Sequence, residues 1–322
     1  MTSFGYNVLG FGGFPDRFNP VTSTMAYIIG RADYYEDVNA YNITTTGNAI
    51  SFGDLQQTER SLGVSSNTTQ ALISGFNYSN NANIDKLNLT SLGNSTSFGN
   101  LTQNSQQGNG LSNSTRAVHS IGYTANLVKT NSIEYMTFGS SGNGTDFGDL
   151  TATMNLGCSS ANSSRGLFGC VAFNVKSNVI NYITIASTGN ATDFGDLFAG
   201  RNGLASCAST TRSIQCGGDA VQHLNAINQT VAANSYSDII DYVTIASAGN
   251  ATDFGDLDVG SRYVSAAGST TRGTITGGQT SGGDTDRIEY VTIASTGNGT
   301  DFGNLIEARI QDGGCSNCHG GL

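Results

Sequence analysis

The residues with the clearest chemical potential are two cysteines and a histidine late in the sequence. Cys315, Cys318 and His319 form a C-x-x-C-H pattern, through which c-type haem is attached to proteins. The two thiols and the imidazole could instead hold a metal ion such as Zn²⁺. Internal repeats weaken both interpretations, because Cys318 and His319 align with a threonine and an arginine of earlier repeats. We therefore expect no haem, no metal and no other cofactor.

The other cysteines are Cys158, Cys170, Cys207 and Cys216. Cys170 and Cys216 fall in segments predicted to be strands, where a thiol packs as a small apolar group. A protein assembled inside a cell keeps such thiols reduced. We expect buried free thiols, with disulfides or a metal site as the alternatives.

Aspartates recur in a triplet, Asp-Phe-Gly, that resembles the metal-binding triplet of protein kinases. The triplets begin at Asp146, Asp193, Asp253 and Asp301. Four copies cannot be one catalytic aspartate, and no Gly-rich loop with its lysine accompanies them. Turn capping is the preferred interpretation, and calcium binding by pairs such as Asp146 with Asp149 is the alternative. Together with only three histidines, this predicts no catalytic residues and no enzymatic activity.

These groups belong to a unit that occurs six times. A shared phenylalanine marks the copies, at Phe52, Phe98, Phe147, Phe194, Phe254 and Phe302. A short polar run, here called the landmark, follows at 18 residues in five copies and at 17 in the last, ending at Gln70, Arg116, Arg165, Arg212, Arg272 and His319. A period of about 50 residues is typical of β-propellers. We expect the landmark arginines to form a ring near the axis and to pair with carboxylates, with an anion channel as the alternative.

Each unit predicts four short antiparallel strands, which in the fifth copy are 212–218, 240–247, 254–260 and 263–269. The 43 glycines, two prolines and absence of tryptophan fit many short strands joined by tight turns. We expect an all-β, six-bladed β-propeller over residues 23–322, with the glycine-ended strands lining the axis. Residues 23–30 look like a missing first strand, so the first and last blades should close the ring side by side.

The order of residues within the unit resembles a kelch repeat. Gly217-Gly218 and Gly277-Gly278 match the kelch glycine pair, and the tyrosine of that repeat is matched by Tyr135, Tyr182, Tyr242 and Tyr290. Phenylalanine stands where kelch repeats have tryptophan, and earlier copies carry single glycines. The segments YVTIASTGNGTDFGNL and GGCSNCHGGL resemble the sequences of repeat proteins of marine bacteriophages, especially cyanophages. That likeness implies a virion structural protein of the tail, fibre or capsid surface, made in the host cytoplasm.

Most length variation lies between the glycine-ended strand and the Ile-x-Tyr strand, so these loops should emerge on one face. The longest is 217–238. Loops on a rigid scaffold are common binding sites. Aromatic and histidine side chains that could stack on sugars or contact a protein partner are Tyr34, Tyr35, Tyr78, Tyr123, His223 and Tyr236. Solvated loops without a function are the alternative.

Residues 1–22 lie outside the repeats and form a predicted N-terminal arm. The arm contains both prolines and the aromatic residues Phe4, Tyr6, Phe11, Phe14 and Phe18. So apolar a segment should pack on the ring or dock into a neighbouring subunit, and we favour docking, which would make the protein a homo-oligomer within the particle.

The charge and hydropathy of the chain limit the classes of partner that it can bind. The formal net charge of −10 argues against nucleic acid as a partner. No stretch is long and apolar enough to insert into a membrane, and no secretory signal is visible. The leading hypothesis is a non-enzymatic virion propeller that contacts other virion proteins and a host glycan. The alternatives are a soluble propeller that binds a glycan or protein, and a glycan-active enzyme.

Overall fold

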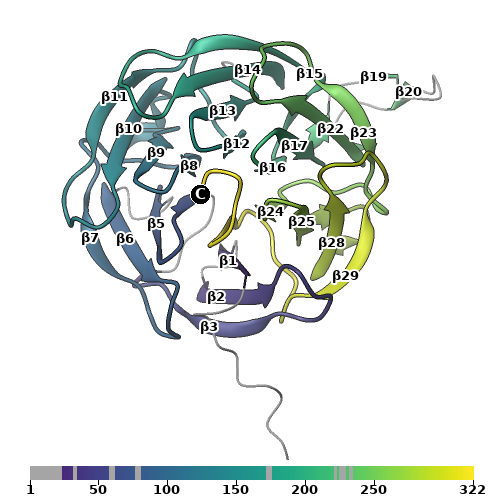
Figure 1. Ribbon diagram of the computed structural model, residues 1–322, viewed down its shortest axis with the longest axis horizontal. Helices are drawn as coiled ribbons and strands as arrows, with labels where there is room; N and C mark the ends of the chain where they lie inside the picture. The colour runs from purple at the N-terminus through teal and green to yellow at the C-terminus, as the bar shows by residue number, and fades with distance from the viewer. Residues whose placement is uncertain are drawn as a thin grey trace, which may run out of the picture.

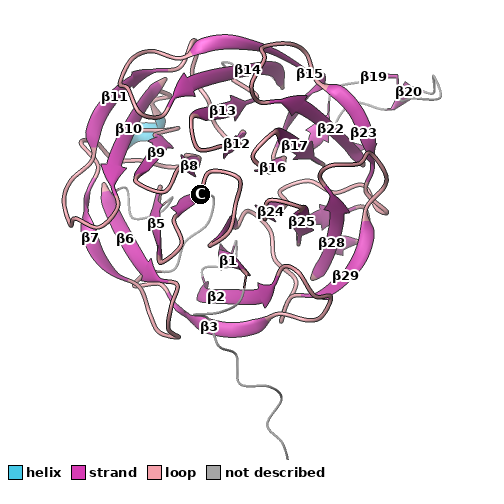
Figure 2. Ribbon diagram, viewed as in Figure 1, coloured by secondary structure: helices cyan, strands magenta, loops and turns pink. Residues whose placement is uncertain are grey.

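The structure is a computed structural model that describes residues 24–31, 35–57, 62–76, 81–171, 176–220, 223–224, 230–231 and 235–322. Six sheets of antiparallel strands stand around a common axis, and each forms one blade (Figure 1). The described residues contain one helical turn, η1 (Ala125–Leu127), among strands and loops (Figure 2). The prediction of an all-β, six-bladed propeller is confirmed.

Each blade has four main strands, which run in order from the axis outwards. They are β30 (Gly313–Ser316), β1 (Met25–Arg31), β2 (Tyr35–Asn42) and β3 (Ile50–Asp54) in blade one; β4 (Gly63–Ser66), β5 (Gln70–Ser74), β6 (Asn83–Asn88) and β7 (Thr96–Asn100) in blade two; β8 (Gly110–Ser112), β9 (Arg116–Ser120), β10 (Ser132–Thr137) and β11 (Thr145–Asp149) in blade three; β12 (Cys158–Ala161), β13 (Arg165–Gly169), β14 (Ser177–Thr184) and β15 (Thr192–Asn202) in blade four; β16 (Ala205–Ala208), β17 (Arg212–Cys216), β22 (Ile239–Thr244) and β23 (Thr252–Asp256) in blade five; and β24 (Ser265–Gly268), β25 (Arg272–Thr276), β28 (Arg287–Thr292) and β29 (Thr300–Asn304) in blade six. Short strands extend the loops: β18 (Asp219–Ala220), β19 (His223–Leu224), β20 (Thr230–Val231), β21 (Ser235–Tyr236), β26 (Gln279–Thr280) and β27 (Gly283–Asp284).

The assignment of strands to blades corrects the sequence prediction. The strand before each landmark is the innermost strand of the next blade, whereas the prediction placed it fourth in its own blade and placed the glycine-ended strands at the axis. The landmark itself forms the tight turn that binds the two strands together. In blade six, for example, the Ser269 hydroxyl accepts hydrogen bonds from the Thr271 and Arg272 amides, which joins β24 to β25.

Ring closure also differs from the prediction of two blades lying side by side. β30 pairs with β1, in a register that sets Ser316 opposite Ala26 and Gly313 opposite Ile29. Blade one is therefore built from both ends of the chain. Such shared blades leave no unpaired inner strand at the closure point, which removes an exposed edge.

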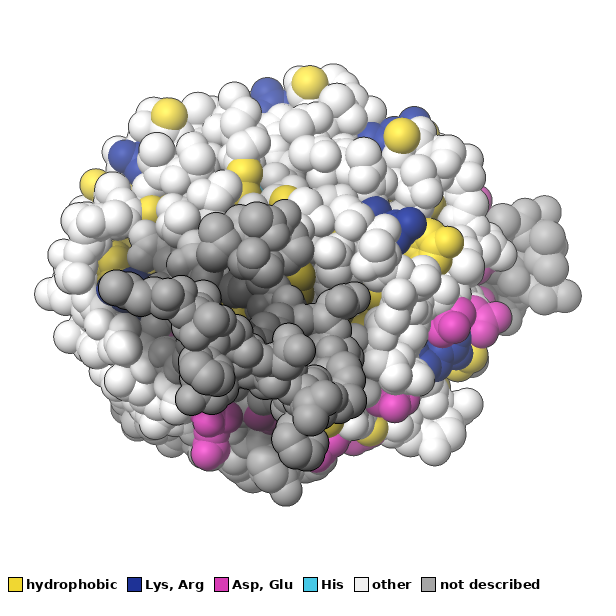
Figure 3. Space-filling view, turned by 60° about the horizontal axis from the view of Figure 1, so that its bottom comes forward, with side chains coloured by type: hydrophobic (Ala, Val, Ile, Leu, Met, Phe, Trp, Pro, Cys, Tyr) yellow, Lys and Arg dark blue, Asp and Glu magenta, His cyan; other side chains and the backbone are white. Residues whose placement is uncertain are grey.

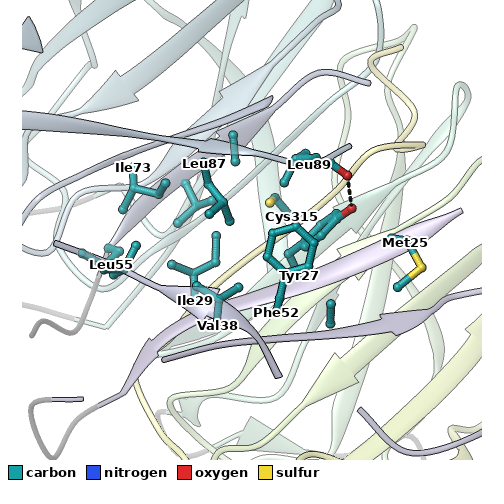
Figure 4. Packing of buried hydrophobic residues seen from close by; sticks show 14 of the residues in the cluster. Met25, Tyr27, Ile29, Val38, Phe52, Leu55, Ile73, Leu87, Leu89 and Cys315 are labelled. Atoms are coloured by element: carbon teal, nitrogen blue, oxygen red, sulfur yellow. Dashed lines mark hydrogen bonds between the residues drawn. The ribbon is translucent and has the colours of Figure 1, made fainter. Parts of the chain in front are cut away.

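The hydrophobic core lies between successive blades. In the part nearest the closure, Tyr27, Phe52, Leu89 and Cys315 pack together, and the Tyr27 hydroxyl donates a hydrogen bond to the Leu89 carbonyl oxygen at 2.9 Å (Figure 4). In blades three to six the repeated phenylalanine meets the repeated tyrosine edge-on, as with Tyr182 and Phe194 at 6.0 Å between ring centroids. Such geometry stabilises aromatic pairs beyond their burial.

The Phe-Gly-Asp/Asn segment joins each blade to the next at the outer rim. At one junction the Gly189 amide donates to the Phe147 carbonyl at 2.7 Å, and the Asn190 Oδ1 accepts from the Asp149 amide at 3.0 Å. All six junctions repeat this asparagine contact, through Asn48, Asn94, Asn143, Asn190, Asn250 and Asn298. The glycine is needed because a Cβ on Gly148 would lie 2.5 Å from the Gly189 carbonyl oxygen.

The landmark arginines also join neighbouring blades, so their predicted place near the axis beside carboxylates is wrong. The Arg165 guanidinium lies 4.6 Å from the centre of the Tyr182 ring, and its Nη1 donates to the Ile245 carbonyl of the next blade at 2.8 Å. Arg116, Arg212 and Arg272 make the same two contacts. The planar guanidinium is attracted to the face of the aromatic ring, so these arginines are stabilised without a carboxylate partner.

All six cysteines are free, and five of them are buried. Burial raises the pKa of the Cys158 thiol to about 11. Cys315 packs in the core beside Tyr27, whereas the His319 ring turns away toward the Ser66 carbonyl oxygen, 2.7 Å from Nε2. Within the described ranges, no three side chains of metal-binding type gather at one point, and no helix has the length and apolar character to cross a bilayer.

Candidate binding pocket on the axis

The innermost strands of all six blades surround a cavity on the ring axis. Its volume is about 100 Å³, and it is lined by the starts of β4, β8, β12, β16, β24 and β30 together with the residues just before them. A second cavity of about 60 Å³ continues along the axis between the ends of the same strands. The inner strands carry mainly small side chains here, which is why a space remains at the centre.

A ring of backbone in the left-handed conformation forms the mouth of the larger cavity. It consists of the residue nine positions after the repeated phenylalanine: Gln107, Leu156, Gly203, Tyr263 and Gln311, with φ between 51° and 61°. Ser61, the sixth position, lies outside the described residues. We call these five residues the collar. Left-handed backbone is unusual for residues other than glycine and is found often at functional sites.

Hydrogen bonds between neighbouring blades explain why the collar has this conformation. The Gly203 amide donates to the Leu156 carbonyl at 2.7 Å, the Tyr263 amide to the Gly203 carbonyl at 2.6 Å, and the Gln311 amide to the Tyr263 carbonyl at 3.0 Å. The positive φ turns each amide and carbonyl along the ring instead of along its own strand. Four consecutive blades are thereby linked, which fixes the shape of the mouth.

The collar keeps one backbone geometry but changes its side chain from blade to blade. At Gly203 packing restricts the residue type, since a Cβ there would lie 2.6 Å from the Tyr263 ring. The Tyr263 ring thus covers the place that a side chain at position 203 would occupy. A constant frame with varied side chains is the arrangement expected of a recognition site.

The mouth opens on the face that carries the long loops, here called the looped face. The loops all connect the second and third strands of a blade, which places them on one face, as predicted. They bind the collar segments directly: the Gly218 amide donates to the Ser261 carbonyl at 2.8 Å, and Arg262 and Gln279 exchange backbone hydrogen bonds.

The opposite end of the axis is crossed by residues 317–322, drawn in yellow over the centre of the ring in Figure 1. The Gly320 amide donates to the Ala208 carbonyl at 3.0 Å, and the His319 ring contacts Ser66 on another blade. No side chain would fit at Gly320 or Gly321, because a Cβ at either would overlap a backbone oxygen. Residues 319–322, which begin at the histidine of the C-x-x-C-H pattern, therefore act as an axial plug.

A cluster of aromatic and charged side chains lies beside the mouth. The Arg262 guanidinium lies 5.0 Å from the centre of the Tyr236 ring and 5.1 Å from that of Tyr263. Gln279 Oε1 accepts hydrogen bonds from its Nε and Nη2 at 3.1 and 2.8 Å. The Asp219 carboxylate forms an ion pair with the Lys176 ammonium at 2.7 Å and lies 3.7 Å from the Arg262 guanidinium. We call these residues the Arg262 cluster.

The structure brings together only part of the predicted loop site. Tyr236 belongs to the Arg262 cluster, while Tyr123 lies on the looped face against Gln106, with Lys129 over its ring at 5.5 Å. Tyr34 and Tyr78 lie outside the described residues, as does the whole N-terminal arm with Phe4, Tyr6, Phe11, Phe14 and Phe18. Tyr35 is in β2 and His223 in β19, but their side chains are outside the described part.

Tyr263 and Gln311 line the pocket, and Arg262 contacts the Tyr263 ring; none of the three was predicted from the sequence. The available signal was position: the ninth residue after the repeated phenylalanine is of five different types in the six repeats, with glutamine at both 107 and 311. Variation at a fixed place in a repeated frame is the pattern to look for in such proteins.

One buried histidine predicts an acid response. His119 lies between the Ser65 and Ser74 hydroxyls, at 2.7 and 2.6 Å from its two ring nitrogens, and burial lowers its pKa to about 3. In the unfolded chain His119 binds a proton below about pH 6.5, whereas in the folded chain it stays neutral down to about pH 3. The free energy of unfolding therefore falls as the pH drops from 6.5 toward 3, by about 1.4 kcal/mol per pH unit.

We expect H119Q, which stays neutral, to show a smaller loss of unfolding free energy between pH 6.5 and 4.5 than the wild type. Denaturant titrations at several pH values measure this difference, and carboxylates cancel because both proteins share them. Equal slopes would show that His119 is protonated in the folded protein.

On the side of the ring seen in Figure 3, most of the described surface is uncharged, with hydrophobic and charged side chains at scattered places. The pocket lining consists mainly of glycine, serine, amide and apolar residues, with one carboxylate, Asp312. A comparison of the chain with protein-family models finds no match, and a comparison with curated proteins finds none at the level that would indicate a relative.

Proposed function

We propose that the protein is a non-enzymatic binding propeller, whose looped face and axial pocket hold a ligand. The observation that supports this most is the collar, in which backbone hydrogen bonds fix a mouth of varied side chains over a cavity of about 100 Å³. Pre-organised sites bind without the entropic cost of ordering loops. The propeller fold is consistent with such a role.

We further propose that the propeller is a component of a phage particle and contacts other virion proteins through residues 1–22. The sequence likeness to cyanophage repeat proteins supports this part. Mounted by the arm, copies of the ring would present the looped face to the surface of a host cell. The alternative is a soluble propeller that binds a glycan or protein partner with no particle.

Purification of particles from the native source tests the virion role. We expect the protein to co-sediment with particles and to be visible as repeated copies by cryo-electron microscopy, and we expect a chain lacking residues 1–22 to be left out of them. The control is the full-length chain with T188A. Thr188 is exposed in the turn between β14 and β15, on the face opposite the looped face. A protein that stays in the soluble fraction would overturn the virion role and leave the binding role in place.

Binding by the looped face is tested separately with R262A, since Arg262 connects Tyr236, Tyr263 and Gln279 beside the mouth. We expect the labelled wild-type ring to adhere to intact host cells, R262A to adhere at least tenfold less, and T188A to adhere as the wild type does. Flow cytometry gives the measurement. Equal adhesion of all three proteins would rule out the looped face as the binding surface.

A further inference from the structure

The axial pocket has features that define a class of ligand, and the inference drawn from them rests on the proposed binding function. The first feature is size. A buried water needs roughly 10–15 Å³ of such space, so a cavity of about 100 Å³ accepts several waters or a single small ring. The inner strands and the plug at Gly320 and Gly321 limit its depth, so a ligand can enter only from the looped face.

The second feature is unsatisfied hydrogen-bonding capacity inside the pocket. The hydroxyls of Ser159 and Ser265 are already used, since they donate to the Gly110 and Asp312 carbonyls at 2.8 and 2.9 Å. In contrast, the Gln311 Oε1 is buried without a hydrogen-bond partner. Buried polar atoms are nearly always satisfied, by protein, water or ligand.

Ser206 adds a second group of this kind. Its Oγ is buried beside the Cys158 thiol, which is a weak partner, and makes no hydrogen bond to oxygen or nitrogen. Both Gln311 and Ser206 line the same cavity, from different blades. Their unused hydrogen-bonding capacity therefore lies in the wall of this cavity.

The third feature is charge. Beside the mouth, Lys176 and Arg262 lie 2.7 and 3.7 Å from Asp219, so their charges are offset by a carboxylate outside the pocket. The lining itself contains one carboxylate, Asp312, and no lysine or arginine. A phosphate or carboxylate ligand would therefore find no positive charge in the pocket to offset its desolvation.

The fourth feature is an amphipathic side chain at the mouth. Tyr263 lines the cavity, is held by the collar with φ 56°, and has one neighbour, Arg262, in cation–π contact. Its ring offers apolar surface and its hydroxyl a polar end. Sugars combine an apolar ring face with hydroxyls at the edge, so they match a tyrosine beside amide and hydroxyl groups.

We propose that the axial pocket binds an uncharged, hydroxyl-rich ring, the terminal neutral sugar of a glycan. Tyr263 packs against the apolar face of the sugar, and Gln311 and Ser206 hydrogen-bond to its hydroxyls. The same site excludes acidic sugars because its lining contains a carboxylate, Asp312, and no lysine or arginine.

Saturation-transfer NMR with the full chain tests the proposal. The probes are the methyl glycosides of glucose, galactose and mannose, with N-acetylneuraminic acid as the charged comparison. We expect transfer to at least one neutral glycoside, and none to N-acetylneuraminic acid. No transfer to any neutral glycoside, or preferred binding of the acid, would overturn the proposal.

Two substitutions at one position then separate volume from hydrogen bonding. S206L fills the axis and should weaken the bound glycoside at least tenfold, while S206A removes only the hydroxyl and should weaken it severalfold. Thermal unfolding shows that each variant is folded. Should S206L not fold, Q311G takes its place, since glycine accepts the positive φ and removes the amide; it should also weaken binding at least tenfold.

Unchanged glycoside affinity in a folded S206L or Q311G variant would also show that the axis is not the site. The binding function and the sugar assignment fail under different results. If the wild type adheres to host cells through Arg262 but binds no neutral glycoside, the sugar assignment is wrong and the binding function stands. If it neither adheres nor binds a glycoside, both are wrong.

Discussion

G99A should lower the free energy of unfolding by at least ~3 kcal/mol, because it forces two blades apart. A Cβ on Gly99 would overlap the carbonyl oxygen of Gly142 in the next blade. The backbone at this junction is fixed by hydrogen bonds from the Gly142 and Gly144 amides to Phe98 and Asn100. Neither segment can shift without losing them. Urea or guanidinium denaturation of the purified protein measures the change.

The matched control is G142A, on the other side of the same contact. A Cβ on Gly142 would meet nothing within 4 Å, and neither glycine has a positive φ, so the main difference between the two substitutions is the space available. We expect G142A to change stability by less than ~0.5 kcal/mol. If the two variants lost equal stability, the cause would be strand or turn propensity, and the close approach of the blades would not be what requires Gly99.

The sixfold repeat made the propeller fold predictable from the sequence. The assignment of strands to blades was not predictable, because it depends on which neighbouring strand each inner strand pairs with. The segment around Ser265 to Gly268 follows one phenylalanine and precedes the next landmark, with short connections on both sides. Strand order along the chain is the same whether it ends one blade or begins the next. In the structure the landmark turn, in which Ser269 accepts a hydrogen bond from the Arg272 amide, joins this strand to β25 and so places it in the next blade.

The arginine contacts, in contrast, were present in the sequence as paired changes. Arg116, Arg165, Arg212 and Arg272 each occur in a blade with the repeated tyrosine. In blade two the landmark residue is Gln70 and the tyrosine position holds Lys86; in blade one these positions hold Met25 and Ala40. Arginine and tyrosine are thus present together and absent together, as expected of side chains that stack on each other.

The pocket was hidden for a different reason. The left-handed conformation of Leu156, Tyr263 and Gln311 goes with hydrogen bonds to the neighbouring blade, not with their residue types. Glycine, which would have signalled it, stands only at position 203. The loop lengths correctly predicted that the long loops lie on one face, and Tyr236 is on that face. The mouth is formed by residues of different blades, so it could be located only in the assembled ring.

The C-terminal segment carries the other large effect. Removal of residues 313–322 deletes β30, and we expect the chain to lose cooperative unfolding and to aggregate. β1 would lose its inner neighbour, exposing Tyr27, Ile28 and Ile29, which are fully buried in the intact ring. An exposed apolar strand edge is a site for association between chains. Size-exclusion chromatography and thermal unfolding measure the outcome.

Removal of residues 319–322 alone is the control, since it takes away the plug but leaves β30 paired with β1. This shorter deletion should keep a cooperative transition and lower its midpoint only slightly, because the lost contacts are few hydrogen bonds such as that from Gly320 to Ala208. Adding a peptide of residues 309–322 to the longer deletion should restore the monomer peak, as the peptide supplies the missing strand. A stable monomer without residues 313–322 would mean that the outer-rim contact between Asn304 and Asn48 is sufficient to close the ring.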